Sequence, residues 1–333
     1  MRVRALSAQE NDRSRVKFSY LVLIIGVCAI TASLADAVEP VRISVTNQNI
    51  SFLPAGVALK KGFFKDEGLD VEIIRMNTPN TITALMTEDI GYTLLLGSVV
   101  RGALRGMPMR VTASLLDSPT HALVAKTDLK AVKELKGKTI GIGNFGGTDE
   151  VVARMICKHF GLDPEKDVKM IAVGPDRARL AALKENLVAA SIIAPPADAL
   201  GKQMGFSILV RGYDVFSFPF IGVSTTVKRV KEKPVEVKKI VRAMIRSNRF
   251  IREDKEGSVK ILMDWGRAER DHSLASYDST VKVFSPNGNI PEDGLRLVVD
   301  LAKTELKISR DVSLSEVIDL TALREAQREL GIR

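Results

Sequence analysis

The sequence predicts an α/β fold of two lobes, each with its own sheet, and three observations lead to this prediction. Short apolar runs typical of strands alternate with segments of helical periodicity, the pattern of crossover units around a largely parallel sheet. This alternation runs from residue 41 to residue 125 and begins again near residue 139. From about residue 234 the chain carries helical periodicity with charged outer faces, so we expect a mainly helical C-terminal third.

In the first half, alternating or fully apolar runs predict five strands, and the segments between them predict three helices. Pro54 suits the first turn of a helix, and Gly62 suits a left-handed cap after it. The expected strands are 41–45, 71–74, 92–96, 110–115 and 122–125, and the expected helices are 54–61, 78–88 and 97–106.

The second half repeats the alternation, and an extended segment at 216–226 leads back toward the first lobe. The expected strands are 139–142, 169–173 and 189–193, with helices at 149–160 and 177–186. The helices expected in the C-terminal third are 234–252, 257–265, 291–306 and 321–330.

The N-terminus has the layout of a secretory signal, because five basic residues precede an uncharged run at 18–35 that ends in small residues. Its strongly apolar part, 20–30, is shorter than the roughly 20 residues of a membrane-spanning helix. We expect residues 1–37 to be a signal peptide cleaved near Ala37, which would make the mature protein periplasmic. An uncleaved membrane anchor is the alternative.

Cysteine and charge counts constrain the mature chain further. Cys28 falls in the leader, where the preceding Val27 disfavours lipid attachment, so Cys157 has no partner for an intramolecular disulfide. Without the leader the net charge falls from +9 to +7, because the leader carries five basic and three acidic residues. A mildly basic protein suits anionic solutes.

Two other classes of function are disfavoured. The basic residues are interleaved with acidic ones, as in 231–233 and 252–256, so we expect no nucleic-acid partner. No G-x-S-x-G motif is present, and His121, His159 and His272 lack metal-ligand spacing. We therefore expect a protein that is not an enzyme, with no catalytic residue, no metal and no cofactor.

One motif carries a resemblance to a known family. Residues 62–71, which read GFFKDEGLDV, resemble the signature of the nitrate, sulfonate and taurine group of importer solute-binding proteins, which includes SsuA-like and thiamine-precursor-like members. Residues 135–142, followed by a Gly-rich turn, look like the start of the second lobe in that family. The resemblance spans roughly 41–330. Residues 87–89 and 185–187 stand where members commonly have Gly-x-Asp, so the subfamily and the ligand stay open.

The resemblance implies a fold like that of type II periplasmic binding proteins, with two α/β lobes, a ligand cleft and two hinge crossings. It implies the solute-binding component of an ABC importer for a small, anionic or aromatic organic solute, such as a sulfonate, taurine or a nitrate-like anion. The expected partners are this small-molecule ligand and an ABC permease in the inner membrane, and we expect a monomer. The expected division is 38–128 for the first part of lobe 1, 129–224 for lobe 2 and 225–333 for the completion of lobe 1, with hinges near 126–129 and 222–227.

Ligands of open parallel sheets bind beyond the carboxyl ends of the strands, so the candidate site lies in the turns that follow the strands. The sharpest candidate is the Gly-rich turn before the helix at 149–160, where backbone N–H groups and a hydroxyl could hold an anion. A plain capping role for Thr148 is the alternative. The candidate ligand-binding residues are Asn47, Gln48, Phe52, Gly97, Ser98, Ser118, Asn144, Gly146, Gly147, Thr148, Pro195 and Phe218. For Arg177 and Arg179 we favour surface positions over contact with a ligand.

Two alternative functions stay open. The same pair of lobes could report ligand occupancy to a membrane receptor instead of feeding a transporter. A related fold also occurs in pyrimidine-precursor enzymes of yeast type. Those enzymes carry a Cys-rich motif, which a mature chain with Cys157 as its one cysteine cannot supply.

Overall fold

The computed structural model describes residues 40–332, and the expected signal peptide lies outside them. Within this range the strands form two five-stranded sheets, A with the order β2-β1-β3-β10-β4 and B with the order β7-β6-β8-β5-β9. The strands of sheet A are β1 Val41–Val45, β2 Val71–Arg75, β3 Tyr92–Leu95, β4 Met109–Leu116 and β10 Ile221–Thr226. Those of sheet B are β5 Ala122–Ala125, β6 Thr139–Ile142, β7 Lys169–Ala172, β8 Ala190–Ile193 and β9 Ser207–Arg211.

Both sheets are mixed, whereas the alternation predicted largely parallel ones. In sheet A, β1 pairs in parallel with β2 and β3, but β10 runs antiparallel to both β3 and β4. In sheet B, β6 pairs in parallel with β7 and β8, and β5 runs antiparallel to β8 and β9. The reversed strand in each sheet is the one by which the chain enters from the other sheet.

The chain crosses between the sheets twice. It leaves sheet A after β4 and enters sheet B at β5, and it leaves sheet B after β9 and returns at β10. The crossings are therefore 117–121 and 212–220, both earlier than the expected 126–129 and 222–227. Because β5 pairs with β8 and β9, residue 122 already belongs to sheet B. We call sheet A with its helices lobe A, and sheet B with its helices lobe B.

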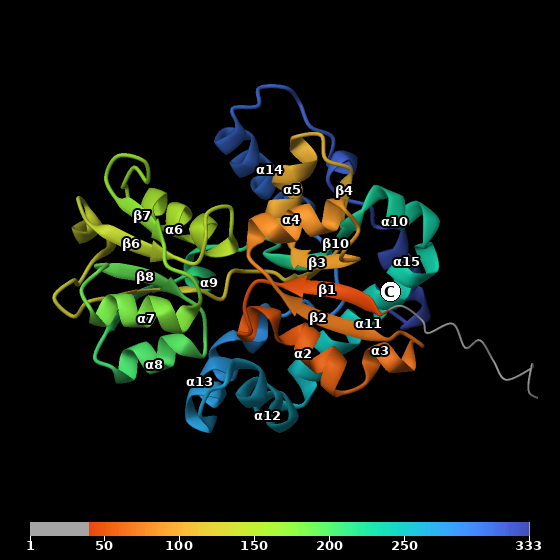
Figure 1. Ribbon diagram of the computed structural model, residues 1–333, viewed down its shortest axis with the longest axis horizontal. Helices are drawn as coiled ribbons and strands as arrows, with labels where there is room; N and C mark the ends of the chain where they lie inside the picture. Colours follow the sequence, from red (N-terminus) through yellow and green to blue (C-terminus); the bar gives the residue numbers. More distant parts are fainter. Residues whose placement is uncertain (1–39, 333) are drawn as a thin grey trace, which may run out of the picture. The chain divides into compact units, whose positions relative to one another are not determined.

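Helices cover both sheets (Figure 1). In lobe B, α6 lies on one side of the sheet and α7 with α8 on the other, as Figure 1 shows. The bounds in lobe B are α6 Thr148–His159, α7 Asp176–Lys184 and α8 Ala197–Gln203, and the short α9 Gly212–Val215 lies in the second crossing. The helices of lobe A are α2 Leu53–Lys60, α3 Phe63–Asp66, α4 Thr78–Met86, α5 Leu96–Leu104, α10 Val227–Glu232, α11 Pro234–Glu253, α12 Lys255–Gly266, α13 Arg270–Thr280, α14 Glu292–Leu306 and α15 Thr321–Glu329.

The C-terminal third packs on lobe A through the long helix α11. Its buried side chains recur at helical spacing, as in Val237, Ile240, Val241 and Met244, so one face is apolar along its length. This face packs against α2, α3 and α15. None of the described helices is long and apolar enough to cross a membrane.

The motif at 62–71 has a structural role in the same contact. Gly62 and Gly68 adopt left-handed backbone angles with φ of 76° and 69°, which favours glycine at both positions. Between them Phe64 is buried, and the buried carboxylate of Glu67 accepts a hydrogen bond from Arg242 Nε of α11 at 2.8 Å. The motif therefore anchors α11 to lobe A.

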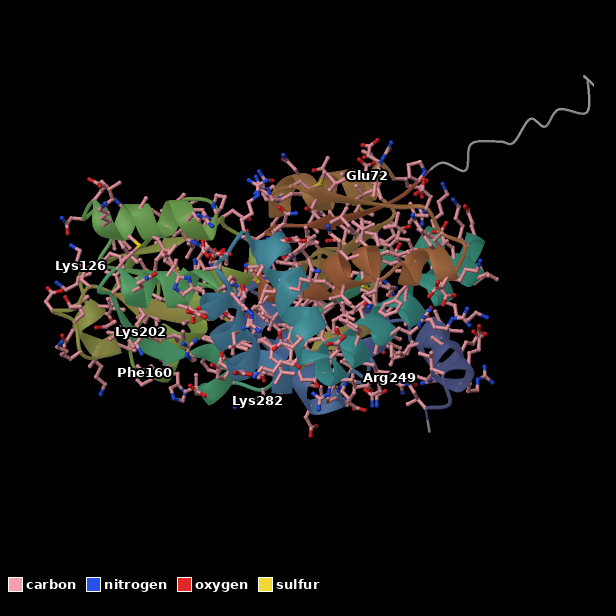
Figure 2. The ribbon with its side chains drawn as sticks, turned by 90° about the horizontal axis from the view of Figure 1, so that it is seen from below. Glu72, Lys126, Phe160, Lys202, Arg249 and Lys282 are labelled. Atoms are coloured by element: carbon pink, nitrogen blue, oxygen red, sulfur yellow. The ribbon has the colours of Figure 1, made fainter. Side chains whose placement is uncertain are left out.

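Charged side chains cover the outside of the described chain, as Figure 2 shows for Glu72 and Lys282 at opposite edges of the molecule. The largest core cluster includes buried apolar residues of both sheets, among them Tyr92, Ile43 and Ile140. Cys157 is buried within it, and burial raises the pKa of its thiol to about 11. Cys157 forms no disulfide within the described residues.

Candidate functional site

Two cavities lie where helices and turns that follow strands of both sheets come together. The larger one, which we call the aromatic cavity, has a volume of about 520 Å³ and is lined by α5, α6, α14 and the segment before β10. The smaller one, the polar cavity, has a volume of about 340 Å³ and is lined by the turns after β1, β2, β6 and β7. Thr148, the first residue of α6, lines both cavities.

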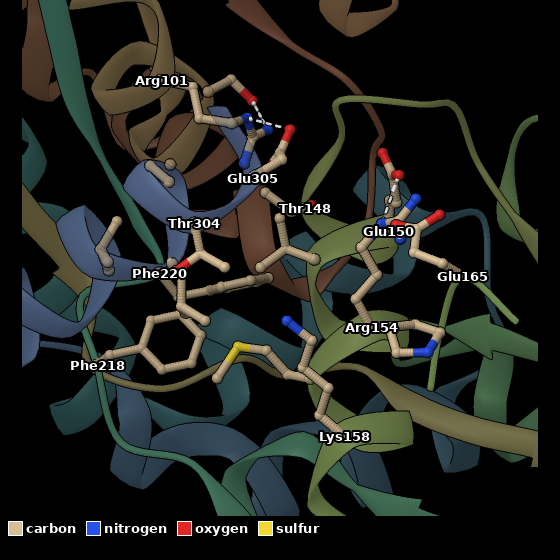
Figure 3. Close-up of a pocket in the computed structure, with 18 of the residues that line it drawn as sticks. Arg101, Thr148, Glu150, Arg154, Lys158, Glu165, Phe218, Phe220, Thr304 and Glu305 are labelled. Atoms are coloured by element: carbon tan, nitrogen blue, oxygen red, sulfur yellow. Dashed lines mark hydrogen bonds and ion pairs between the residues drawn. The ribbon is translucent and has the colours of Figure 1, made fainter. Parts of the chain in front are cut away.

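Phe218 and Phe220, on the second crossing, form an apolar wall of the aromatic cavity (Figure 3). Their ring centroids are 6.0 Å apart in an edge-to-face arrangement, and the residues are 4% and 3% exposed. Pro219 and Met155 extend this apolar lining. Rigid aromatic walls of this kind are typical of small-molecule sites and suit a flat apolar ligand.

Four basic residues line the aromatic cavity beside this wall: Arg101, Arg154, Lys158 and Lys307. Arg154 is paired with Glu150 at 2.8 Å, and Arg101 donates to the carbonyl oxygen of Gly146 at 2.5 Å. Burial lowers the pKa of Arg101. Lys158 forms no ion pair with a carboxylate of the described chain, and Figure 3 shows its amine pointing into the cavity. Lys158 is thus the cation best placed to meet an anionic group of a ligand.

The Gly-rich turn before α6 is arranged differently from the expectation. The N–H of Gly146 donates to the carboxylate of Glu150 at 2.5 Å, and the N–H of Gly143 donates to that of Asp149. Acidic side chains in the first turn satisfy the free amides of a helix N-terminus, which also favours negative charge. Two amides of this turn are therefore occupied by the helix's own acids. Gly147 takes the capping position, and Thr148 begins the helix.

A buried charge cluster lines the polar cavity. Arg179 is 2% exposed and forms ion pairs with Asp149 and Asp176, so its expected surface position is wrong. The carboxylate of Asp176 also accepts hydrogen bonds from Asn47 at 2.6 Å and Asn49 at 3.0 Å. Burial disfavours the charge of Arg179, but the two carboxylates outweigh it and raise the pKa of this guanidinium. The cluster joins the turn after β1 in lobe A to α6 and α7 in lobe B.

His121 ends the first crossing and lines the polar cavity. It is 3% exposed, its Nδ1 has no hydrogen-bond partner in the described chain, and its ring lies edge-to-face 5.4 Å from Phe220. Burial lowers the pKa of His121 to about 4, so the ring is neutral at pH 7. The two crossings therefore meet at the boundary of the two cavities.

The structure brings most of the predicted site residues to this region but divides them among cavities. Gly97, Ser98, Thr148 and Phe218 line the aromatic cavity, and Asn47, Phe52, Asn144 and Thr148 line the polar one. Gln48 lines a third cavity, which is also bordered by Asn47.

The remaining predicted residues line none of these three cavities. The hydroxyl of Ser118 donates to the carbonyl of Asp117, and Pro195 accepts from the backbone N–H of Ile50. Gly146 accepts from the hydroxyl of Ser98 at 2.8 Å, and Gly147 caps α6.

The sequence made Phe218 and Phe220 candidates for an apolar wall, whereas Lys158, Arg101 and Arg154 were missed as cavity-lining residues. A Phe-Pro-Phe run was a visible signal for Phe220, whereas the basic residues lie inside helices whose orientation only packing determines. Among the described residues, no group of three or more His, Cys, Asp or Glu side chains could hold a metal ion.

Two mixed α/β sheets joined by two crossings, with cavities at the junction, define the periplasmic binding protein fold. The chain belongs to the NMT1/THI5 like family, whose sequence model matches residues 49–258. The chain is also similar in fold to the periplasmic nitrate-binding protein NrtA from Synechocystis PCC 6803. That likeness has a TM-score of 0.76 at 17% identity and covers 88% of this chain and 89% of NrtA. Other structures with this fold include ligand-binding components of ABC importers.

Two kinds of curated relative are similar to this chain. The 4-amino-5-hydroxymethyl-2-methylpyrimidine phosphate synthase THI11 of Saccharomyces cerevisiae is 35% identical over 120 residues. That match covers 34% of this chain and 34% of THI11, so the chain spans about a third of the length of this relative. The riboflavin-binding protein RibY of Chloroflexus aurantiacus is 28% identical over 232 residues, which cover 65% of this chain and 64% of RibY.

Proposed function

We propose that this chain is the periplasmic solute-binding component of an ABC importer, exported by an N-terminal signal peptide and active as a monomer beside an inner-membrane permease. Its solute is a small organic anion with a flat, apolar or aromatic body. The relatives and structural neighbours that bind nitrate, sulfonates or riboflavin support this class of function.

The observation that carries the proposal is that the aromatic ring of Phe218 and the amine of Lys158 line the same cavity. The aromatic cavity has a volume of about 520 Å³, within the range of roughly 300–1,000 Å³ that small organic ligands occupy. A cavity of this size favours an organic molecule over an inorganic anion such as nitrate. The ring of the solute would lie on Phe218 and Phe220, and its anionic group would meet the amine of Lys158.

Binding would couple to closure of the two lobes. The hinges of this proposal are the crossings 117–121 and 212–220, and Phe218, Phe220 and His121 belong to them. Residues of both lobes line the aromatic cavity, so a solute held there stabilises the closed arrangement over an open one. The permease would recognise the closed form.

A thermal-shift screen tests the proposal. The panel holds riboflavin, 4-amino-5-hydroxymethyl-2-methylpyrimidine phosphate, an aromatic sulfonate, taurine and nitrate. A ligand at 100 times its dissociation constant stabilises the native state by about 2.7 kcal/mol, so true ligands raise the melting temperature clearly. We expect flat aromatic anions to stabilise the protein and nitrate to have no effect. Stabilisation by nitrate or taurine alone would contradict the assignment of the aromatic cavity.

A pyrimidine-precursor synthase is the second candidate, and the 35% identity to THI11 favours it. Incubation with a bound solute separates the two functions. A binding protein returns the solute with its mass unchanged, whereas a synthase yields a product of different mass.

A further inference from the structure

We propose that a third cavity, which we call the arginine groove, is a binding site for a compact multivalent anion, either a polyphosphate or a polycarboxylate. The groove has a volume of about 490 Å³. It is separate from the aromatic cavity and shares with the polar cavity the turn after β1, the end of β2 and the start of α7. This inference does not rest on the proposed function, because the groove would bind its anion whatever solute the aromatic cavity holds.

Three arginines define the groove: Arg75 at the end of β2, Arg177 in the first turn of α7 and Arg267 directly after α12. None of the three forms an ion pair with a carboxylate of the described chain, although many other arginines of this protein do. Guanidinium groups bind carboxylates and phosphates through paired, charge-assisted hydrogen bonds. Three guanidinium groups without a carboxylate partner in the described chain therefore favour, around one cavity, an anion with several oxygens.

The other charges in the groove leave this positive character intact. Asp176 is buried, and its carboxylate is already used by Arg179 and by the amides of Asn47 and Asn49. Among the lining residues, Glu269 is the one acidic group not neutralised by an arginine. Arg75 and Arg267 belong to lobe A and Arg177 to lobe B, so the complete set of three depends on both lobes.

The backbone at Arg267 is strained and contacts Arg177 at the groove. Arg267 has φ of 50° and ψ of 50°, the left-handed conformation in which glycine commonly ends a helix. An arginine in this conformation is strained relative to glycine, as are the residues with positive φ at the ends of three other helices. The carbonyl of Arg267 also accepts a hydrogen bond from the guanidinium of Arg177, which links the two lobes at the groove.

The single tryptophan of the sequence, Trp265, lines the groove and reports on it directly. Calorimetric titration with tripolyphosphate and with citrate, followed in parallel by Trp265 fluorescence, tests the proposal. We expect saturable one-to-one binding of at least one of them, a fluorescence change with the same dissociation constant, and weaker binding as salt rises. The tighter of the two compounds identifies the phosphate or the carboxylate class.

Two substitutions distinguish a binding role from a structural one. R75Q removes one charge-assisted hydrogen bond and should weaken binding by about tenfold. R267G should relieve the strained backbone and raise the melting temperature, yet weaken anion binding to a similar extent. N186G is the matched control, because Asn186 follows α7 with the same left-handed backbone, φ of 60°, but lines neither the groove nor the aromatic cavity. It should raise the melting temperature and leave anion binding unchanged.

Three outcomes would overturn the proposal. The first is the absence of both heat and fluorescence change with either anion. The second is binding that R75Q and R267G leave unaltered. The third is tighter binding of a hexaglutamate peptide than of either compact anion, since that would make the groove a docking surface for an acidic protein segment.

Discussion

The side chain of Asn47 donates a hydrogen bond from Nδ2 to Oδ2 of Asp176 over 2.6 Å and so joins the two lobes. Asn47 follows β1 of lobe A, and Asp176 is the first residue of α7 in lobe B. Burial disfavours the charged form of Asp176, but the guanidinium of Arg179 outweighs it and lowers the pKa of this carboxyl. The carboxylate is thus held charged at the lobe boundary, where it can receive donors from the opposite lobe.

Replacing Asp176 with alanine should lower the free energy of unfolding by about 3 kcal/mol, because Arg179 would lose one of its two buried carboxylate partners. Urea unfolding at pH 7 measures the loss. Asp66→Ala serves as the control, since Asp66 pairs with Arg246 on the surface at 2.8 Å and such exposed pairs contribute about 1 kcal/mol or less. Equal effects of the two substitutions would show that the buried cluster contributes no more than a surface pair.

Asp117, on the first crossing, should destabilise the protein at neutral pH. One of its oxygens is buried without a hydrogen-bond partner among residues 40–332, and burial raises the pKa of Asp117 to about 6. The native state therefore binds more protons than the unfolded state between about pH 4 and pH 6, so stability falls as the pH rises through this window. Above pH 6, the free energy of unfolding of Asp117→Asn should exceed that of the unchanged protein by about 1 kcal/mol, a value that allows for the partial exposure of Asp117. Urea unfolding measures this difference.

His121 should have the opposite pH dependence. Burial lowers the pKa of His121 to about 4, below its unperturbed value near 6.5. The unfolded chain then binds a proton that the native state does not, so stability falls as the pH drops from about 6.5 to about 4. The full contribution is up to about 3 kcal/mol. In His121→Gln, the free energy of unfolding should depend less on pH across this range. An unchanged pH dependence would mean that His121 is protonated in the native state.

Lys158 and Phe218 should act on different parts of a bound solute. Lys158→Met should weaken the binding of an aromatic anion by about tenfold, because one charge-assisted contact is lost. The binding of a neutral analogue should be unaffected. Phe218→Ala should weaken the binding of both compounds by similar factors, because the apolar wall contacts the ring that they share. Calorimetric titration of both compounds into both variants measures this split. Equal losses for the two compounds in Lys158→Met would place the anionic group elsewhere.

The order and type of the principal elements could be predicted from the sequence because apolar periodicity is local. Helix α13 was missed for a physical reason. Its buried residues include Ser273, Ser276 and Thr280, which give no apolar stripe, and the last two bond carbonyls of their own helix at 2.6 Å. The positions of the crossings were also missed, since the antiparallel entry of β5 into sheet B depends on pairing with distant strands.

The site was predictable where it depends on strand ends and unpredictable where it depends on packing. Turns after strands were expected to converge, and the structure brings Asn47, Asn144 and Thr148 to one cavity, while their contact with a ligand stays a prediction. The burial of Arg179 could not be foreseen, because its two carboxylate partners come from separate helices. Lys158 lies ten residues after Thr148, so the cavity it faces is decided by how α6 packs.

The central claim is that an organic anion binds against Phe218 and Phe220 and is released unchanged. The most direct measurement is calorimetric titration of the best ligand from the thermal-shift panel into the native chain and Phe218→Ala, followed by mass analysis of the recovered ligand. We predict one-to-one binding, about tenfold weaker for the variant, and an unaltered mass. An unchanged dissociation constant for Phe218→Ala, or a recovered ligand of different mass, would contradict the account.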